Sequence, residues 1–116
     1  MEPKETPQGQ RALKFANALV SGDFGHASEM LSASLRQEYA GSQLRDEYEE
    51  MIEYGDGPPD LVEVMNVLED WPAKEPDDVG WAYVAIAGPG YSEGISVVVN
   101  REGEEELIRE IEWGRP

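Results

Sequence analysis

Hydrophobic residues in the first third of the chain recur at helical spacing. Between residues 11 and 21 the apolar positions form one stripe, made of Ala12, Phe15, Ala16, Leu19 and Val20. Gly22 ends this pattern, and Asp23 is a good N-cap for a second helix. The apolar positions of that second helix are Ala27, Met30, Leu31 and Leu35. The pattern therefore predicts two amphipathic helices joined by a tight Gly-Asp turn.

A third helix is predicted to begin at Ser42 as its N-cap and to end before Gly55. One face of this helix is apolar, and it carries Leu44, Tyr48, Met51 and Ile52. The segment GDGPPD at residues 55–60 then combines two glycines with two prolines, which can neither continue a helix nor pair inside a sheet. We therefore expect three helical pieces before residue 55.

After residue 60 the helical spacing of the apolar residues ends, and β-branched and aromatic residues dominate the sequence. They form four runs, at residues 61–69, 81–87, 91–100 and 107–113. The last three runs are separated by connections short enough for hairpins, so the strands are expected to be antiparallel neighbours. Helices followed by antiparallel strands indicate one α+β domain over residues 11–116, with the polar residues 1–10 as a flexible leader.

The order of elements resembles the NTF2-like superfamily, the cystatin-like cone shared with ketosteroid isomerases. The resemblance rests on the helix through Phe15, Ala16 and Leu19, the Gly22-Asp23 turn, and the apolar positions that follow. It implies three N-terminal helices packed on a curved four-stranded antiparallel sheet that encloses a pocket or supports a dimer. Members include isomerases, dehydratases, transport adaptors and toxin-immunity proteins, so this likeness does not determine the function.

The charge balance limits the kinds of partner. The chain has 25 Asp and Glu against 9 Lys and Arg, a formal net charge of -16. This field repels phosphate backbones, so nucleic-acid binding is excluded, whereas a basic protein partner is compatible with it. The alternative is that the acidity only keeps the protein in solution. No apolar stretch suits a signal peptide or a membrane span, and we expect a cytoplasmic location with no membrane contact.

The residue types exclude several chemistries. The chain has no cysteine and one histidine, His26, and no phosphate-binding or dinucleotide-binding glycine pattern. We therefore expect neither a metal site nor a cofactor. His26 lies in the first turn of the predicted second helix, where a solvent-facing role is favoured over catalysis.

A candidate ligand pocket comes from the alternation of the last two strands. Glu93 shares a face with Ile95 and Val97, and Arg109 alternates with Leu107 and Ile111, so the two charged groups could face each other. The aromatic or polar walls of this pocket would be Trp81, Tyr83, Trp113, Tyr48 and His26. Alternatively, the pair fixes strand register, or a bulge at Gly94 turns Glu93 to solvent.

The favoured function is a non-catalytic domain that binds a small apolar ligand or a protein partner through its concave sheet, with toxin immunity as one form. The alternative is a small cofactor-independent lyase or isomerase that uses a pocket carboxylate. The strands are apolar on both alternations, for example at Val97, Val98 and Val99, while the helices can cover only one face. We therefore predict a two-fold homodimer packed through the sheet.

Overall fold

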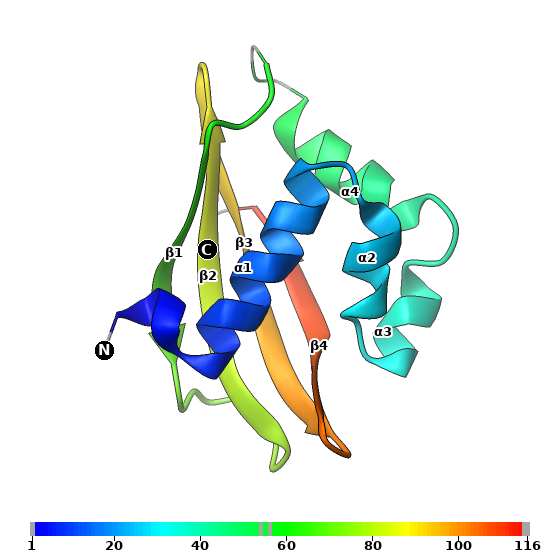
Figure 1. The fold of residues 1–116 in the computed structure, drawn as a ribbon, viewed down its shortest axis with the longest axis vertical. Coiled ribbons are helices and arrows are strands. Elements are labelled where there is room, and N and C mark those ends of the chain that lie inside the picture. Colours follow the sequence, from blue (N-terminus) through cyan, green and yellow to red (C-terminus); the bar gives the residue numbers. More distant parts are fainter. Residues whose placement is uncertain (1, 54, 56, 115–116) are drawn as a thin grey trace.

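The computed structural model describes residues 2–53, 55 and 57–114, and it confirms an α+β fold with the helices before the sheet (Figure 1). The helical elements are the 3-10 turn η1 (Pro3–Glu5), α1 (Pro7–Val20), α2 (Phe24–Glu29), α3 (Ala33–Glu38) and α4 (Gln43–Ile52). The strands are β1 (Leu61–Leu68), β2 (Asp78–Gly88), β3 (Tyr91–Glu102) and β4 (Glu105–Trp113). The described chain thus has four α-helices where the sequence predicts three.

The first helix begins at Pro7, four residues before its predicted start at Arg11. Thr6 is the N-cap, since its hydroxyl oxygen accepts a 3.0 Å hydrogen bond from the Gly9 N–H, and proline suits the first helical position. Gln8 is buried and its side-chain amide donates to the carbonyl of Leu68 on β1, at 3.3 Å. The segment expected to be a flexible leader therefore contributes η1 and the first turn of α1.

The predicted second helix is two helices, and this part of the prediction is wrong. Between α2 and α3 the backbone pairs with β4: Ser32 donates to the carbonyl of Ile108 at 2.7 Å, and Ile108 donates to that of Met30 at 2.8 Å. The Ser32 side chain then caps α3 by accepting from the Leu35 N–H. Because the competing bonds come from a strand 76 positions away in sequence (108 minus 32), the local pattern does not reveal the break.

The sheet has the order β1-β2-β3-β4, and every neighbouring pair is antiparallel, as predicted. The turns after β2 and β3 contain Gly90 and Gly103, whose positive φ angles of 78° and 65° suit glycine. One irregularity changes the interpretation of the last strand. Between Val98 and Val99 the register on β4 moves from Glu110 to Ile108, which leaves Arg109 as an extra residue in a β-bulge.

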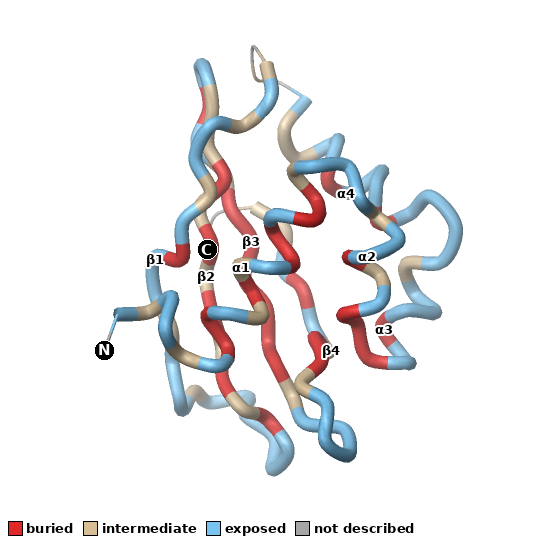
Figure 2. Tube along the Cα trace, in the orientation of Figure 1, coloured by how far each residue is buried: buried red, intermediate tan, exposed pale blue. Residues whose placement is uncertain are grey.

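All four α-helices contribute to one hydrophobic core against a single face of the sheet, and α1 crosses β2 and β3 (Figures 1 and 2). On the sheet this core contains Ala82, Val84 and Ile86 of β2, Ile95, Val97 and Val99 of β3, and Ile108 and Ile111 of β4. The residues between them point to the other face, which no described helix covers. None of the described helices has the length and hydropathy needed to cross a bilayer.

Candidate functional site

The space between the helices and the sheet is filled by side chains. Phe15 and Leu19 of α1 have no exposed surface, and neither do Ile86 and Ile95 beneath them. These residues belong to one close-packed cluster with Leu31 and Ile108. The helix-facing side of the sheet, where a ligand pocket is expected, is therefore the hydrophobic core.

Glu93 and Arg109 lie on different faces of the sheet. Glu93 pairs in register with Ile86 and so faces the helices, as the alternation predicts, where it lines an open hollow of about 290 Å³ beside Trp113 and α4. Arg109 lies in the bulge of β4 and bonds Asp78 on the opposite face. The expected pocket between Glu93 and Arg109 is a wrong prediction, because the bulge shifts the alternation of β4 by one residue.

Arg109 forms a bidentate ion pair that crosses three of the four strands. Its Nε and one terminal nitrogen each donate to a carboxylate oxygen of Asp78 at 2.6 Å, across the intervening strand β3. The Asp78 side chain is only 1% exposed, and its carboxylate also accepts from the Glu75 N–H at 2.8 Å. This pair joins β2 to β4, and the partner of Arg109 is Asp78 and not the Glu93 of the register-fixing alternative.

The pKa values of this pair reflect its mutual stabilisation. Burial alone would raise the pKa of Asp78, but the hydrogen bonds from Arg109 and Glu75, with the charge of Arg109, lower it below its ordinary value. The hydrogen bond to Asp78 raises the pKa of Arg109, against the effect of burial. Both groups are therefore charged and engaged with each other, and Arg109 is not available to a ligand carboxylate.

The face of the sheet away from the helices, here called the open face, is aromatic at its centre. Trp81 and Tyr83 of β2 lie on this alternation and are half-buried. A Cβ added at Gly94 on β3 would come within 2.6 Å of the Tyr83 ring, so this ring lies against the glycine. The outer strands carry exposed carboxylates on the same alternation, at Glu63 of β1 and at Glu110 and Glu112 of β4.

The remaining predicted pocket residues are dispersed. His26 is exposed in α2, where its backbone N–H bonds the Asp23 carboxylate at 3.1 Å. Tyr48 is buried in the core with its ring 6.1 Å from that of Phe24. Trp113 donates from Nε1 to the Tyr39 hydroxyl at 3.0 Å, with an edge-to-face ring contact. Of the predicted set, only Glu93 and Trp113 line the same hollow.

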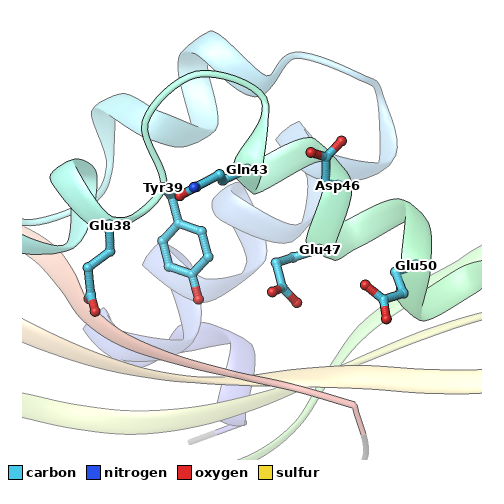
Figure 3. Close-up of a pocket in the computed structure, with 6 residues that line it drawn as sticks. All are labelled: Glu38, Tyr39, Gln43, Asp46, Glu47 and Glu50. Carbon is cyan, nitrogen blue, oxygen red and sulfur yellow. The ribbon is translucent and has the colours of Figure 1, made fainter.

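An acidic hollow between α3 and α4 is a surface that the sequence analysis does not identify. Its volume is about 360 Å³, and it is lined by Glu38, Tyr39, Gln43, Asp46, Glu47 and Glu50 (Figure 3). Tyr39, Glu47 and Glu50 extend toward the sheet, while Asp46 points away from it. Glu47 and Glu50 also line the neighbouring hollow that contains Glu93 and Trp113, so the two hollows are adjacent along α4, and together they are called the groove along α4.

Three carboxylates of this groove form no ion pair with the basic residues that the structure describes. Glu38, Glu47 and Glu50 form no ion pair within the described residues, and Asp46 accepts a hydrogen bond from the Ser42 hydroxyl. Arg45, on the same helix, instead lies over the Phe24 ring at 5.1 Å. The sequence does contain a signal for this surface, because the acidic residues Asp46, Glu47 and Glu50 lie between the apolar positions of the predicted third helix.

Among the described residues, no group of three or more His, Cys, Asp or Glu side chains is placed so that it could hold a metal ion. Comparison of the chain with protein-family models, with curated proteins and with solved structures finds no match. The argument about function therefore rests on the groove and on the open face.

Proposed function

We propose that this chain is a non-catalytic binding domain for a basic protein partner, and that the groove along α4 contacts the partner. The observation that carries the proposal is the set of carboxylates at Glu38, Glu47 and Glu50, which form no ion pair within the described residues. The net charge of -16 adds a long-range field of the same sign. Such a field accelerates the association of a cationic protein and favours it over an acidic one.

The floor of the groove suits an arginine or lysine side chain in particular. Tyr39 and Trp113 form an aromatic wall whose rings are 6.1 Å apart, next to the carboxylates. A guanidinium group can stack on an aromatic ring and donate to carboxylates at the same time. Met51 gives the aliphatic stem of such a side chain an apolar contact.

The kind of binding protein that we propose follows from the resemblance to the NTF2-like superfamily. The Gly22-Asp23 turn and the order of helices and strands support this resemblance. Within this family a toxin-immunity protein fits best, because an acidic surface can cover the basic cleft of a nuclease. The lyase or isomerase alternative is less favoured, since Glu93 lines an open hollow and the interior is filled. A small apolar ligand is less favoured for the same reason.

The test uses a short oligo-arginine peptide as the probe, with binding measured by calorimetry at several salt concentrations. The variant Glu47→Gln/Glu50→Gln removes two carboxylates from the groove. The control Glu104→Gln/Glu105→Gln removes the same charge from the exposed hairpin between β3 and β4. We expect about fivefold weaker binding for the groove variant, since two partly screened ion pairs contribute about 1 kcal/mol together.

Binding should weaken as salt is added, because the attraction is electrostatic. Equal affinities for the groove variant and the hairpin control would show that the peptide follows only the net charge, and the proposal would then be abandoned. A Tyr39→Leu variant adds a check on the aromatic wall. It leaves every carboxylate in place, so any loss of affinity reports the ring.

A further inference from the structure

The two edges of the sheet differ in how the fold covers them. On β4 the link between α2 and α3 bonds the outer edge, since the Ile108 N–H donates to Met30 and the Ile108 carbonyl accepts from Ser32. On β1, at the other edge, β2 is the only strand that pairs with it, and no backbone–backbone hydrogen bond joins residues 61–68 to a described helix or loop. An edge strand of this kind presents a row of backbone donors and acceptors to an incoming chain.

The strand β1 also carries exposed apolar side chains. Leu61, Met65 and Leu68 are 43%, 53% and 38% exposed, and among the described residues every large hydrophobic side chain that is exposed belongs to this strand. One exposed apolar side chain is ordinary in a soluble protein. Three of them along an uncovered edge indicate a contact surface.

A hollow of about 630 Å³ follows this edge. Residues 61–65 line it in an unbroken row. Because successive residues of a strand point to opposite faces, a hollow with such a lining lies along the edge of the strand and not over one face. Its other lining residues come from α1, at Leu13, and from η1, which lies beside β1 (Figure 1). No backbone hydrogen bond joins η1 to β1 among the described residues, so the edge stays accessible.

The carboxylates along β1 indicate the chemistry of the occupant. Glu63 lies in the strand, Asp60 precedes it and Glu69 follows it, and all three are exposed and form no ion pair within the described residues. Opposite charges on neighbouring strands attract each other, and like charges repel. A strand with basic side chains is therefore favoured here, whereas a second copy of β1 would bring carboxylates together.

We propose that an extended segment of a basic protein adds to the edge of β1 as a fifth strand of the sheet. Backbone pairing is expected along residues 61–64, because the bulge at Met65 interrupts the row of backbone groups. Apolar side chains of the added strand would contact Leu61 and Met65, and alternate basic side chains would lie near Glu63. In such strand addition the main-chain hydrogen bonds supply the affinity and the side-chain alternation supplies the specificity.

This surface is separate from the groove along α4. The helix α4 contacts β3 and β4, and Figure 1 places it on the side of the sheet away from β1. The residues that line the groove include none of β1. The strand addition is thus a further contact of the domain, and it does not require the groove to bind anything.

The experiment is amide hydrogen exchange of the full chain, measured by nuclear magnetic resonance with and without a hexapeptide that alternates lysine and valine. At saturating peptide we expect outward-facing amide protons within residues 61–64 to exchange about tenfold more slowly, and those of β4 to be unchanged. The matched probe is the same peptide N-methylated at every amide, which keeps the charge and the side chains. It should bind about tenfold more weakly, since even two lost main-chain hydrogen bonds account for that factor.

Two variants separate the edge from the groove. Leu61→Thr/Met65→Thr changes no charge and keeps strand-forming residues, and it should weaken the binding of the alternating peptide about threefold. The groove variant Glu47→Gln/Glu50→Gln should bind this peptide as the hairpin control Glu104→Gln/Glu105→Gln does, because both remove the same charge away from β1. A loss of oligo-arginine binding that spares the alternating peptide therefore concerns the groove alone.

Three outcomes overturn the proposal. The first is equal affinity for the N-methylated and the unmodified peptide, which needs no variant and so does not depend on how a variant folds. The second is unchanged exchange within residues 61–64 at saturating peptide, since the peptide then lies elsewhere. The third is protection of residues 61–64 that grows as the chain alone is concentrated, because that result assigns the edge to a second copy.

Discussion

The two faces of the sheet are stabilised in different ways. The helix side is stabilised by the packing of apolar side chains, among which Phe15, Leu19 and Ile95 are fully buried. The open face is held by one ion pair across three strands and by an aromatic ring that lies against Gly94. The apolar side chains of the helix side are excluded from solvent, whereas Trp81 and Tyr83 on the open face are only half-buried. The fold therefore depends on the first face, and the second remains available for association.

The largest expected effect is the difference in stability between a substitution on the helix side of the sheet and one on the open face. Phe15→Ala removes a fully buried ring from the helix side, and we expect the free energy of unfolding to fall by about 4 kcal/mol. Trp81→Ala removes a larger ring from the open face, but this ring is only half-buried, so the monomer should lose about 1 to 2 kcal/mol. Urea denaturation of both variants at low salt measures the difference.

Similar losses for Phe15→Ala and Trp81→Ala would contradict the contrast between the faces. They would show that the open face is as tightly packed as the core. Low salt and low protein concentration disfavour self-association, so that the two values compare the monomer alone.

The second prediction concerns the ion pair that clamps the open face. Arg109→Met leaves the Asp78 carboxylate, which is 1% exposed, without its cation, and unfolding should become easier by about 3 kcal/mol. The double variant Asp78→Leu/Arg109→Met replaces both charges with apolar side chains. We expect it to be more stable than Arg109→Met alone, because no buried charge is left unpaired. Additive losses would show that the two residues act separately.

The ion pair between Asp78 and Arg109 also makes the stability of the fold depend on pH, in a direction that can be predicted. The pKa of Asp78 is lower in the folded protein than its ordinary value of 3.8, so the folded state favours the carboxylate. This stabilisation is fully present above pH 3.8 and is lost as the pH falls through the lowered folded pKa. Acid titration of the double variant should lack this component. An unchanged acid midpoint would assign the acid sensitivity to other carboxylates.

The elements that depend on local pattern were predictable, and those that depend on distant contacts were not. The change of period after residues 55–60 gave four antiparallel strands correctly. The start of α1 at Pro7 could also have been found, because Thr6 followed by proline is a helix-start signal. By contrast, the break between α2 and α3 arises from backbone bonds between Ser32 and Ile108, which no local pattern contains.

The candidate site shows the same division. Glu93 was placed on the correct face because β3 alternates without interruption from Glu93 to Val99. Arg109 was placed on the wrong face, because a single extra residue in β4 inverts the alternation. The groove along α4 requires the loop that brings Tyr39 over Trp113, a contact between positions 74 residues apart. Surface sites of this kind form only once the elements have been packed.

The smallest expected effect is a gain in stability on the helix side. The Tyr48 hydroxyl is buried with no hydrogen-bond partner among the described residues, so Tyr48→Phe should raise the free energy of unfolding by up to about 1 kcal/mol. Tyr91→Phe is the control with the opposite sign, because the Tyr91 hydroxyl donates to the carbonyl of Gly57 at 3.1 Å.

Alkaline titration sharpens this last prediction. Burial, and then the charges of Tyr91 and Glu49, raise the pKa of Tyr48 from 10.0 to about 12. The protonated phenol is therefore favoured in the folded state, and its stabilisation is complete below pH 10 and lost as the pH rises to about 12. Tyr48→Phe cannot ionise, so its denaturation midpoint should fall less over this range than that of the parent chain. A midpoint that falls equally in both would mean that Tyr48 reaches water in the folded protein, and that the helix side is less tightly packed at α4 than at α1.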